Sequence, residues 1–227
     1  RRFHPTGITK LYREFLIYKN FLSIEMPLLI CEGKTDIIYI KCALNKLAPI
    51  YNEFVKINDK GINYKIKFLN FSNNLRDVFA ISKGTSGLKH LMEIYENNIG
   101  RFKEVVKKHP VIIILDNDDG AKEIKKKLSI KKGDSIKPYY HFLENLYVLI
   151  TPKGKDMAIE DLFDSHTLSK KLGGKIFNRM NNIDTENEYG KFVFAEKVIK
   201  ENQNDINFDG FKDIFDGLKL IVEDYQK

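Results

Sequence analysis

The chain has 227 residues, of which 43% are hydrophobic and 30% are charged, and its formal net charge is +7. These values exclude a disordered or fibrous chain and suit one large globular domain. No apolar run approaches the ~20 residues that cross a bilayer, and no signal-peptide segment precedes the domain, so we expect a cytoplasmic protein without a membrane partner. The excess of positive charge favours a polyanionic partner, above all nucleic acid.

Strands and helices alternate along the first two thirds of the chain. Apolar residues at helical spacing predict a leading helix over residues 7–22 and a second helix from Thr35 to Leu47. Short apolar or alternating runs predict four strands, over residues 27–31, 64–70, 111–115 and 146–150. A glycine-rich turn at residues 83–87 leads into a helix predicted to reach residue 102, and a lysine-rich helix follows the third strand.

After residue 152 the pattern becomes helical, with helices predicted over Met157–Phe163, Lys191–Glu201 and Phe208–Tyr225. The alternation before it predicts an α/β fold with a mostly parallel sheet flanked by helices, followed by a helical C-terminal elaboration. Sheets of this kind bind ligands at the carboxyl ends of their strands. The two cysteines, Cys31 and Cys42, are expected to be reduced core thiols rather than zinc ligands.

Acidic residues follow two of the predicted strands at the point where each strand ends. Glu32 follows the run PLLIC, and Asp36 opens the next helix. Asp116 follows the run VIIIL, and Asp118 lies two residues on, where an extended backbone points it to the same side. In neighbouring parallel strands these carboxylates would converge and repel one another unless a cation neutralised them. Carboxylate oxygens are ligands that Mg²⁺ or Mn²⁺ prefers.

A strand ending in Glu-Gly-x-x-Asp, followed downstream by a strand ending in Asp-x-Asp, resembles the Toprim domain. This domain occurs in topoisomerases, DnaG-type primases, RecR-type recombination proteins and OLD-family nucleases. The long spacing, from residue 32 to residue 116, and the turn at 83–87 are more similar to the OLD branch. The resemblance implies a Toprim-type sheet over residues 26–205, between a leading helix at 1–25 that connects to an upstream domain and a C-terminal helix at 206–227.

Two later elements are also similar to OLD-like nucleases. Glu160 and Asp161 stand in an Ile-Glu-Asp element, and Lys191 stands in a Gly-Lys-x-x-x-Ala context. In that family the acidic element completes a second metal site, and the lysine stabilises the transition state. The resemblance therefore implies a Mg²⁺- or Mn²⁺-dependent nuclease with two ions. Its implied catalytic residues are Glu32, Asp116, Asp118, Glu160 and Lys191, and its implied metal ligands are Glu32, Asp36, Asp116, Asp118, Glu160 and Asp161.

The stretch CEGKTDIIY, residues 31–39, is similar to the C-terminal Toprim region of certain retron reverse transcriptases. The chain starts with Arg1 and Arg2 rather than Met, as expected of a domain cut from a longer polypeptide. This resemblance implies an upstream reverse transcriptase domain and its RNA–DNA product as partners. It also implies a role as the effector of antiviral defence.

Several of these residues have a plain structural interpretation as well. Asp36 could cap its helix, and we expect Asp119 to cap the lysine-rich helix. Glu160 and Asp161 could form an exposed pair on an amphipathic helix. The lysine-rich run could be a solvated face or could hold a phosphate backbone; it comprises Lys122, Lys125, Lys126, Lys127, Lys131 and Lys132.

Two other functions compete with the nuclease. One is a non-catalytic Toprim module that binds nucleic acid or a second subunit of a homo-oligomer, with acids that are structural or vestigial. The other is primase-like nucleotidyl transfer, which uses the same acids and needs a template-binding domain. The complete set of acids favours the nuclease over the binding module.

Overall fold

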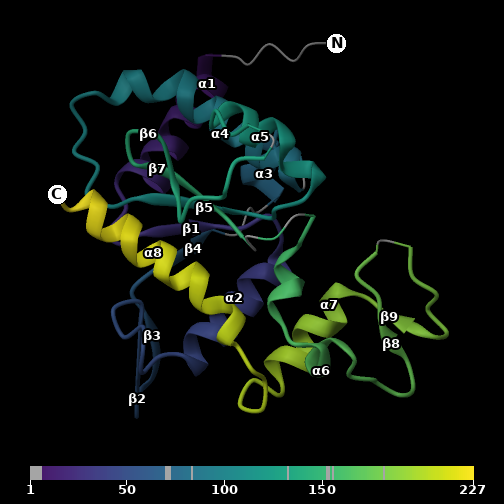
Figure 1. The fold of residues 1–227 in the computed structure, drawn as a ribbon. Coiled ribbons are helices and arrows are strands. Elements are labelled where there is room, and N and C mark those ends of the chain that lie inside the picture. The colour runs from purple at the N-terminus through teal and green to yellow at the C-terminus, as the bar shows by residue number, and fades with distance from the viewer. Residues whose placement is uncertain are drawn as a thin grey trace.

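The computed structural model describes residues 7–69, 73–82, 84–131, 133–151, 154, 156–180 and 182–227. Its centre is a five-stranded sheet with the strand order β4-β1-β5-β7-β6 (Figure 1). The first four strands in this order run parallel, and β6 is antiparallel to β7 at one edge. The strands are β1 (Leu28–Ile30), β4 (Lys67–Leu69), β5 (Val111–Leu115), β6 (Tyr140–Leu143) and β7 (Leu146–Ile150).

The three central strands are buried along their whole length, which explains their unbroken apolar sequences. Ile30 of β1 pairs with Ile113 of β5, and Leu115 of β5 pairs with Ile150 of β7. This parallel register brings the carboxyl ends of β1, β5 and β7 to one edge of the sheet. The prediction of an α/β fold with a mostly parallel sheet flanked by helices is confirmed.

Helices cover both faces of the sheet (Figure 1). One hydrophobic cluster contains Leu28 and Ile113, and the other contains Leu29 and Ile112, because successive strand residues point to opposite faces. The helices that contribute to the first cluster are α1 (Gly7–Ile17), α3 (Asn73–Phe79), α4 (Thr85–Ile99) and α5 (Lys122–Lys127). Those that contribute to the second are α2 (Lys34–Lys46), α6 (Ser165–Leu168) and α8 (Lys212–Tyr225), together with the helix that continues α7 (Lys191–Val193).

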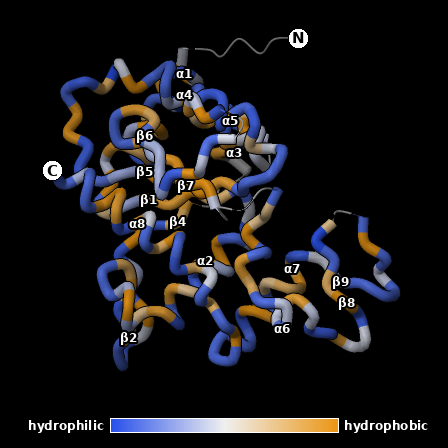
Figure 2. Tube along the Cα trace, viewed as in Figure 1, coloured by the Kyte–Doolittle hydropathy of each residue, from blue (hydrophilic) through white to orange (hydrophobic). Residues whose placement is uncertain are grey.

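Two small pairs of strands stand outside the sheet. The hairpin of β2 (Val55–Asn58) and β3 (Gly61–Tyr64) lies beside α2. The pair of β8 (Ile176–Phe177) and β9 (Glu188–Tyr189) belongs to an arm that extends away from the sheet in Figure 1. In Figure 2 hydrophobic residues gather at the strands in the middle of the molecule, and many outer loops are hydrophilic.

Several predicted helices are shorter or more irregular than expected. α1 ends at Ile17 and continues as a π-helix, Tyr18–Leu22, and α7 continues as a π-helix, Phe194–Lys200. Short 3₁₀ turns flank other helices or replace a predicted one; they are Gly100–Phe102, Asp119–Ala121, Ile159–Leu162 and Asp209–Phe211. The Gly-rich turn is shorter than predicted, because α4 already begins at Thr85.

The single strand predicted over residues 64–70 is wrong. Tyr64 ends the β2–β3 hairpin, and a separate strand, β4, begins at Lys67, where its amide donates to the Pro27 carbonyl beside β1. The antiparallel edge strand β6 and the arm carrying β8 and β9 were not expected from the sequence. Both cysteines are buried free thiols, as predicted. Among the described helices, none has the length and apolar character needed to cross a membrane.

Candidate active site

The acidic motif after β1 forms the turn into α2. The Gly33 amide donates to Asp36 Oδ2 at 2.8 Å, and the Thr35 hydroxyl donates to Asp36 Oδ1 at 3.1 Å. Asp36 is therefore buried in the first turn of α2, where a carboxylate compensates the unpaired amides of a helix start. The capping interpretation of Asp36 is confirmed, and its carboxylate also lies close enough to the other acids to affect their pKa values.

Glu32 is backed by the glycine-rich turn that precedes α4. The Thr85 hydroxyl donates to Glu32 Oε2 at 2.9 Å, and a Cβ placed on Gly84 would lie 3.4 Å from Glu32 Oε1. Gly84 has φ +76°, a conformation that L side chains rarely adopt. Burial and the charges of Asp36 and Asp118 raise the pKa of Glu32, although the hydrogen bond from Thr85 opposes this shift.

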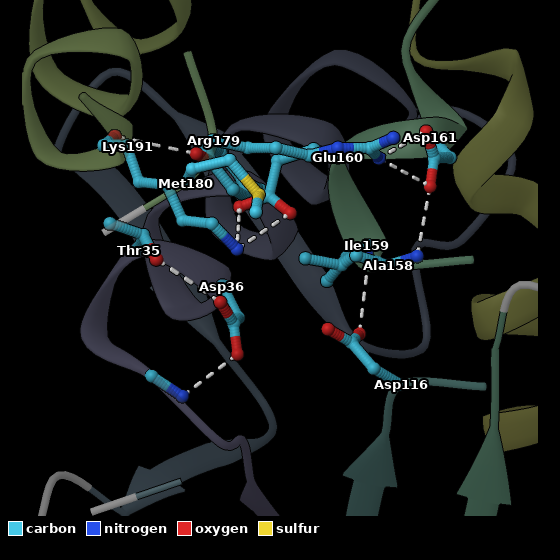
Figure 3. Close-up of polar contacts among 12 residues, drawn as sticks. Thr35, Asp36, Asp116, Ala158, Ile159, Glu160, Asp161, Arg179, Met180 and Lys191 are labelled. Carbon is cyan, nitrogen blue, oxygen red and sulfur yellow. Dashed lines mark hydrogen bonds and ion pairs between the residues drawn. The ribbon is translucent and has the colours of Figure 1, made fainter. Parts of the chain in front are cut away.

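Asp116 follows β5 directly and lies among acids from other segments. Its Oδ1 accepts a hydrogen bond of 3.0 Å from the Ile159 amide. Burial, together with the charges of Asp36, Glu32 and Glu160, raises the pKa of Asp116 to about 8. The carboxylates of Asp36, Asp116 and Glu160 lie around the space into which Lys191 projects (Figure 3). The structure thus places acids from three separate segments within electrostatic reach of one another.

Asn117, between the two aspartates, joins the two acidic elements. Its backbone amide donates to the Met157 carbonyl at 3.0 Å, and its side-chain amide donates to the Gly154 carbonyl at 2.6 Å. The Lys125 ammonium donates to its Oδ1. Asn117 is buried, so it fixes the loop after β5 against the segment that carries Glu160. The sequence analysis did not single out Asn117. The one feature of the sequence that could have indicated it is an amide side chain between two aspartates.

Asp118 and Asp119 have different environments. Asp118 caps the 3₁₀ turn, because its Oδ1 accepts from the Ala121 amide at 3.3 Å. Asp119 is exposed, and its Oδ1 lies 3.0 Å from the Lys122 ammonium. The residue before α5 at its N-terminus is Ala121, so the prediction that Asp119 caps the lysine-rich helix is wrong. The helical segment begins with the 3₁₀ turn Asp119–Ala121, which leads directly into α5. Its N-cap residue is therefore Asp118.

Glu160 lies in the 3₁₀ turn after β7 and is 1% exposed. The Lys191 ammonium donates to its Oε2 at 3.1 Å and lies 3.1 Å from its Oε1 (Figure 3). Burial raises the pKa of Glu160 despite this neighbour. Burial opposes protonation of Lys191, but the charges of Glu160, Asp116 and Asp36 raise its pKa overall. Both groups are part of the same electrostatic cluster.

Asp161 points away from that cluster. Its Oδ2 accepts from the Ala158 amide at 2.9 Å, and Arg179 donates to Oδ1 and Oδ2 at 2.7 and 2.8 Å. Arg179 belongs to the arm that carries β8 and β9. Asp161 therefore ties the arm to the turn that contains Glu160, and the interpretation of Glu160 and Asp161 as an exposed pair is wrong for both.

The lysine-rich run after the Asp116 loop is paired with neighbouring acids in part, at Lys122 and Lys127. Lys122 pairs with Asp119, and Lys127 pairs with Glu96 at 2.8 Å. Lys125 is half-buried against Asn117. Lys126 and Lys131 are exposed, and Lys132 lies outside the described residues. This pairing favours the interpretation as a solvated, internally neutralised face.

Carboxylates are suitable ligands for a hard divalent cation, but in this structure they lie too far apart to share one. Among the described residues, no three His, Cys, Asp or Glu side chains converge closely enough to hold a metal ion. Glu32, Asp36 and Asp116 form no ion pair with a described residue. Burial, and after it the charges of neighbouring acids, raises the pKa values of Glu32 and Asp116. A cation between them would offset this repulsion, so the donor set fits the metal that the resemblance implies.

No family model matches the chain, and no solved structure matches it. The Toprim resemblance therefore rests on the motifs and on their arrangement at the sheet edge.

Proposed function

We propose that this protein is a metal-dependent nuclease that hydrolyses phosphodiester bonds at the carboxylate cluster. The observation that carries this proposal is the gathering of Glu32, Asp36, Asp116 and Glu160 from three segments, where burial and the neighbouring charges together raise the pKa of Asp116 to about 8. Burying like charges together is unfavourable, so a site of this kind indicates a function that needs a cation. The net charge of +7 supports a nucleic-acid substrate.

Glu32, Asp36 and Asp116 would hold one Mg²⁺ or Mn²⁺ ion, and Glu160 would contribute to a second. When bound, such ions supply a Lewis acid and lower the pKa of a coordinated water. Lys191 would neutralise charge that develops on the phosphate, since its side chain is 40% exposed and directed at the cluster by Glu160. Asp118 lies close enough to Glu32 to affect its pKa and would contribute from the helix start.

We assign Asp161 a positioning role in this mechanism. Its carboxylate is occupied by the Ala158 amide and by Arg179, and both contacts orient the turn that presents Glu160. A direct metal bond from Asp161 would break at least one of these contacts.

We further propose that the domain is the effector of a retron-type antiviral system, with an upstream reverse transcriptase domain and its RNA–DNA product as partners. The support for this wider role is the similarity of residues 31–39 to the Toprim region of retron reverse transcriptases. The competing binding module is less favoured, because a module without catalysis would gain nothing from carboxylates whose burial destabilises the fold.

The direct test is to incubate the purified chain with single- and double-stranded DNA and RNA in Mg²⁺ or Mn²⁺. Glu32→Gln and Asp116→Asn should reduce cleavage by more than about 100-fold, because each removes a metal ligand. Asp119→Asn is the matched control, since the Asp119 side chain is 81% exposed and pairs with Lys122 on the surface. Equal cleavage by the wild type and both ligand variants would overturn the assignment. Binding without cleavage in either metal would favour the binding module.

A further inference from the structure

The segment between the Glu32 motif and β4 carries a concentration of unpaired positive charge. Residues 34–68 contain seven lysines and three acidic residues. The lysines are Lys34, Lys41, Lys46, Lys56, Lys60, Lys65 and Lys67. Within the described part of the chain none of them forms an ion pair with a carboxylate, and all except Lys41 are exposed. This surface is therefore more available to a polyanion than the paired lysines of α5.

A groove lies within the same segment, between the C-terminal end of α2, the β2–β3 hairpin and the turn around Gln203. It encloses about 640 Å³, within the ~300–1,000 Å³ of small-molecule sites. Ile57 and Ile62, a cross-strand pair that is 52% and 46% exposed, give it an apolar wall. Asn52 and Gln203 add amide groups, and Lys46 and Lys56 add positive charge, whereas no carboxylate lines it.

Helix α2 connects this groove to the carboxylate cluster. Asp36 lies in its first turn, and Asn45 lines the groove nine residues later, about 14 Å along the helix axis. Lys34, Ile38, Lys41 and Asn45 recur at helical spacing and so share one face of α2. On this face the Lys41 ammonium lies 5.4 Å from the ring centre of Tyr64 and 5.0 Å from that of Phe68, and both rings are partly exposed.

We propose that this surface, from Lys34 along α2 to the groove at Ile57 and Ile62, binds one unpaired nucleic-acid strand. The inference rests on the proposed function, since it places the reacting phosphate at the carboxylates. Lysines that track a backbone, with aromatic and apolar side chains that contact bases, are the combination that binds single strands. A duplex stacks its base faces inside and would leave the apolar wall and the amide groups without partners. The 14 Å of α2 matches about four nucleotides at the 3.4 Å spacing of a stacked strand.

The test measures binding in EDTA, so that no cleavage takes part. The probe is a fluorescently labelled 12-residue oligothymidylate, compared with a 12-base-pair duplex by anisotropy over a range of salt concentrations. The Lys34→Gln/Lys56→Gln variant should bind the single strand at least about 10-fold more weakly. Its plot of log affinity against log salt should be shallower by about 1.4, since each lost phosphate contact removes about 0.7. Wild type should bind the single strand more tightly than the duplex.

The matched control is Lys122→Gln/Lys126→Gln, which makes the same change of charge on exposed lysines of α5. Its affinity should stay within about twofold of wild type, because these lysines lie outside the proposed surface. A further variant, Ile57→Ala/Ile62→Ala, should weaken binding without changing the salt slope, because apolar contacts release no counterions. Thermal unfolding would confirm that each variant is folded.

Equal losses in the two lysine pairs, or tighter binding of the duplex, would overturn the inference. This binding test and the cleavage test of the proposed function can fail independently, because binding is measured without metal. If the wild type cleaves nothing in Mn²⁺ while Lys34→Gln/Lys56→Gln still binds the single strand more weakly, the binding surface is supported and the nuclease function is contradicted. If cleavage depends on Asp116 while the two double-lysine variants bind the single strand equally well, the nuclease function is supported and the binding surface is contradicted.

Discussion

The acids after β1 and β5, the first half of the acidic sheet edge, differ from those after β7, the second half, in what compensates their charge. In the first half, Glu32, Asp36 and Asp116 accept hydrogen bonds, among the described residues, from hydroxyl groups and backbone amides. Neutral donors leave the net negative charge in place, and this charge adds to burial in raising the pKa of Asp116 to about 8.

In the second half each acid has its own cation. Glu160 lies 3.1 Å from the Lys191 ammonium, and Asp161 lies 2.7 Å from Arg179. The comparison teaches that the first half needs an added cation, whereas the second is already neutralised by side chains of the chain itself. We therefore expect one divalent ion to bind tightly at the first half. A second ion at Glu160 has to compete with Lys191 and should bind more weakly.

The largest effect should be on metal affinity. Asp116→Asn should weaken Mn²⁺ binding by about 100-fold or more, because it removes a charged ligand from the half that lacks any cation. Glu160→Gln should weaken it by about 10-fold or less. Isothermal titration calorimetry measures both, with Asp119→Asn as the exposed control. Equal losses for Asp116→Asn and Glu160→Gln would remove the distinction between the halves.

The pH dependence of stability should also follow the first half. The folded protein binds a proton at Asp116 up to a pKa of about 8, whereas the unfolded chain releases it near 3.8, the ordinary pKa of an aspartate. Between these values the folded state carries more protons, so the free energy of unfolding falls as pH rises. In EDTA we expect a loss of roughly 3–4 kcal/mol from pH 5 to pH 8, measured by urea denaturation. Asp116→Asn or saturating Mg²⁺ should largely abolish this loss; an unchanged slope in Asp116→Asn would show that other groups cause it.

A smaller effect is expected when the cation of the second half is removed. Lys191→Gln leaves Glu160, 1% exposed, without its ammonium partner. The loss of stability should be about 1–2 kcal/mol, less than for a fully buried pair because Lys191 is 40% exposed. Lys197→Gln, which breaks an exposed pair with Glu201, is the control and should leave the stability almost unchanged, because solvent screens this pair. Added Mg²⁺ should stabilise Lys191→Gln more than wild type, since the ion then meets no competing ammonium.

The smallest effect should come from the tie between the arm and the Glu160 turn. Arg179→Gln should cost about 0.5–1 kcal/mol, because its side chain is 49% exposed. Asp161→Ala should cost more, since it also removes the acceptor for the Ala158 amide. A double-mutant cycle followed by thermal unfolding measures the coupling of the two residues. A coupling of zero would mean that Asp161 acts only through the Ala158 amide.

Much of the site could be predicted because its acids follow strands directly. A buried apolar run that ends in a carboxylate places this group at the edge of a parallel sheet, whatever the rest of the chain does. The residues that support the acids were not predictable in this way. Thr85 reaches Glu32 across 53 residues, and Asn117 reaches Gly154 across 37, so only the packing of distant segments brings these groups together.

The sequence by itself determined the parallel sheet and the place of Glu32, Asp116 and Glu160 after β1, β5 and β7, because strand burial and strand ends are local properties. It left open whether the lysines of α5 form a solvated face or hold a phosphate backbone. The tertiary structure pairs two of them, because α4 and the Asp116 loop supply Glu96 and Asp119, whereas the lysines of residues 34–68 form no ion pair within the described part of the chain. Charge compensation acts over a few ångströms in space rather than along the chain, so only the folded protein could decide which lysines stay free.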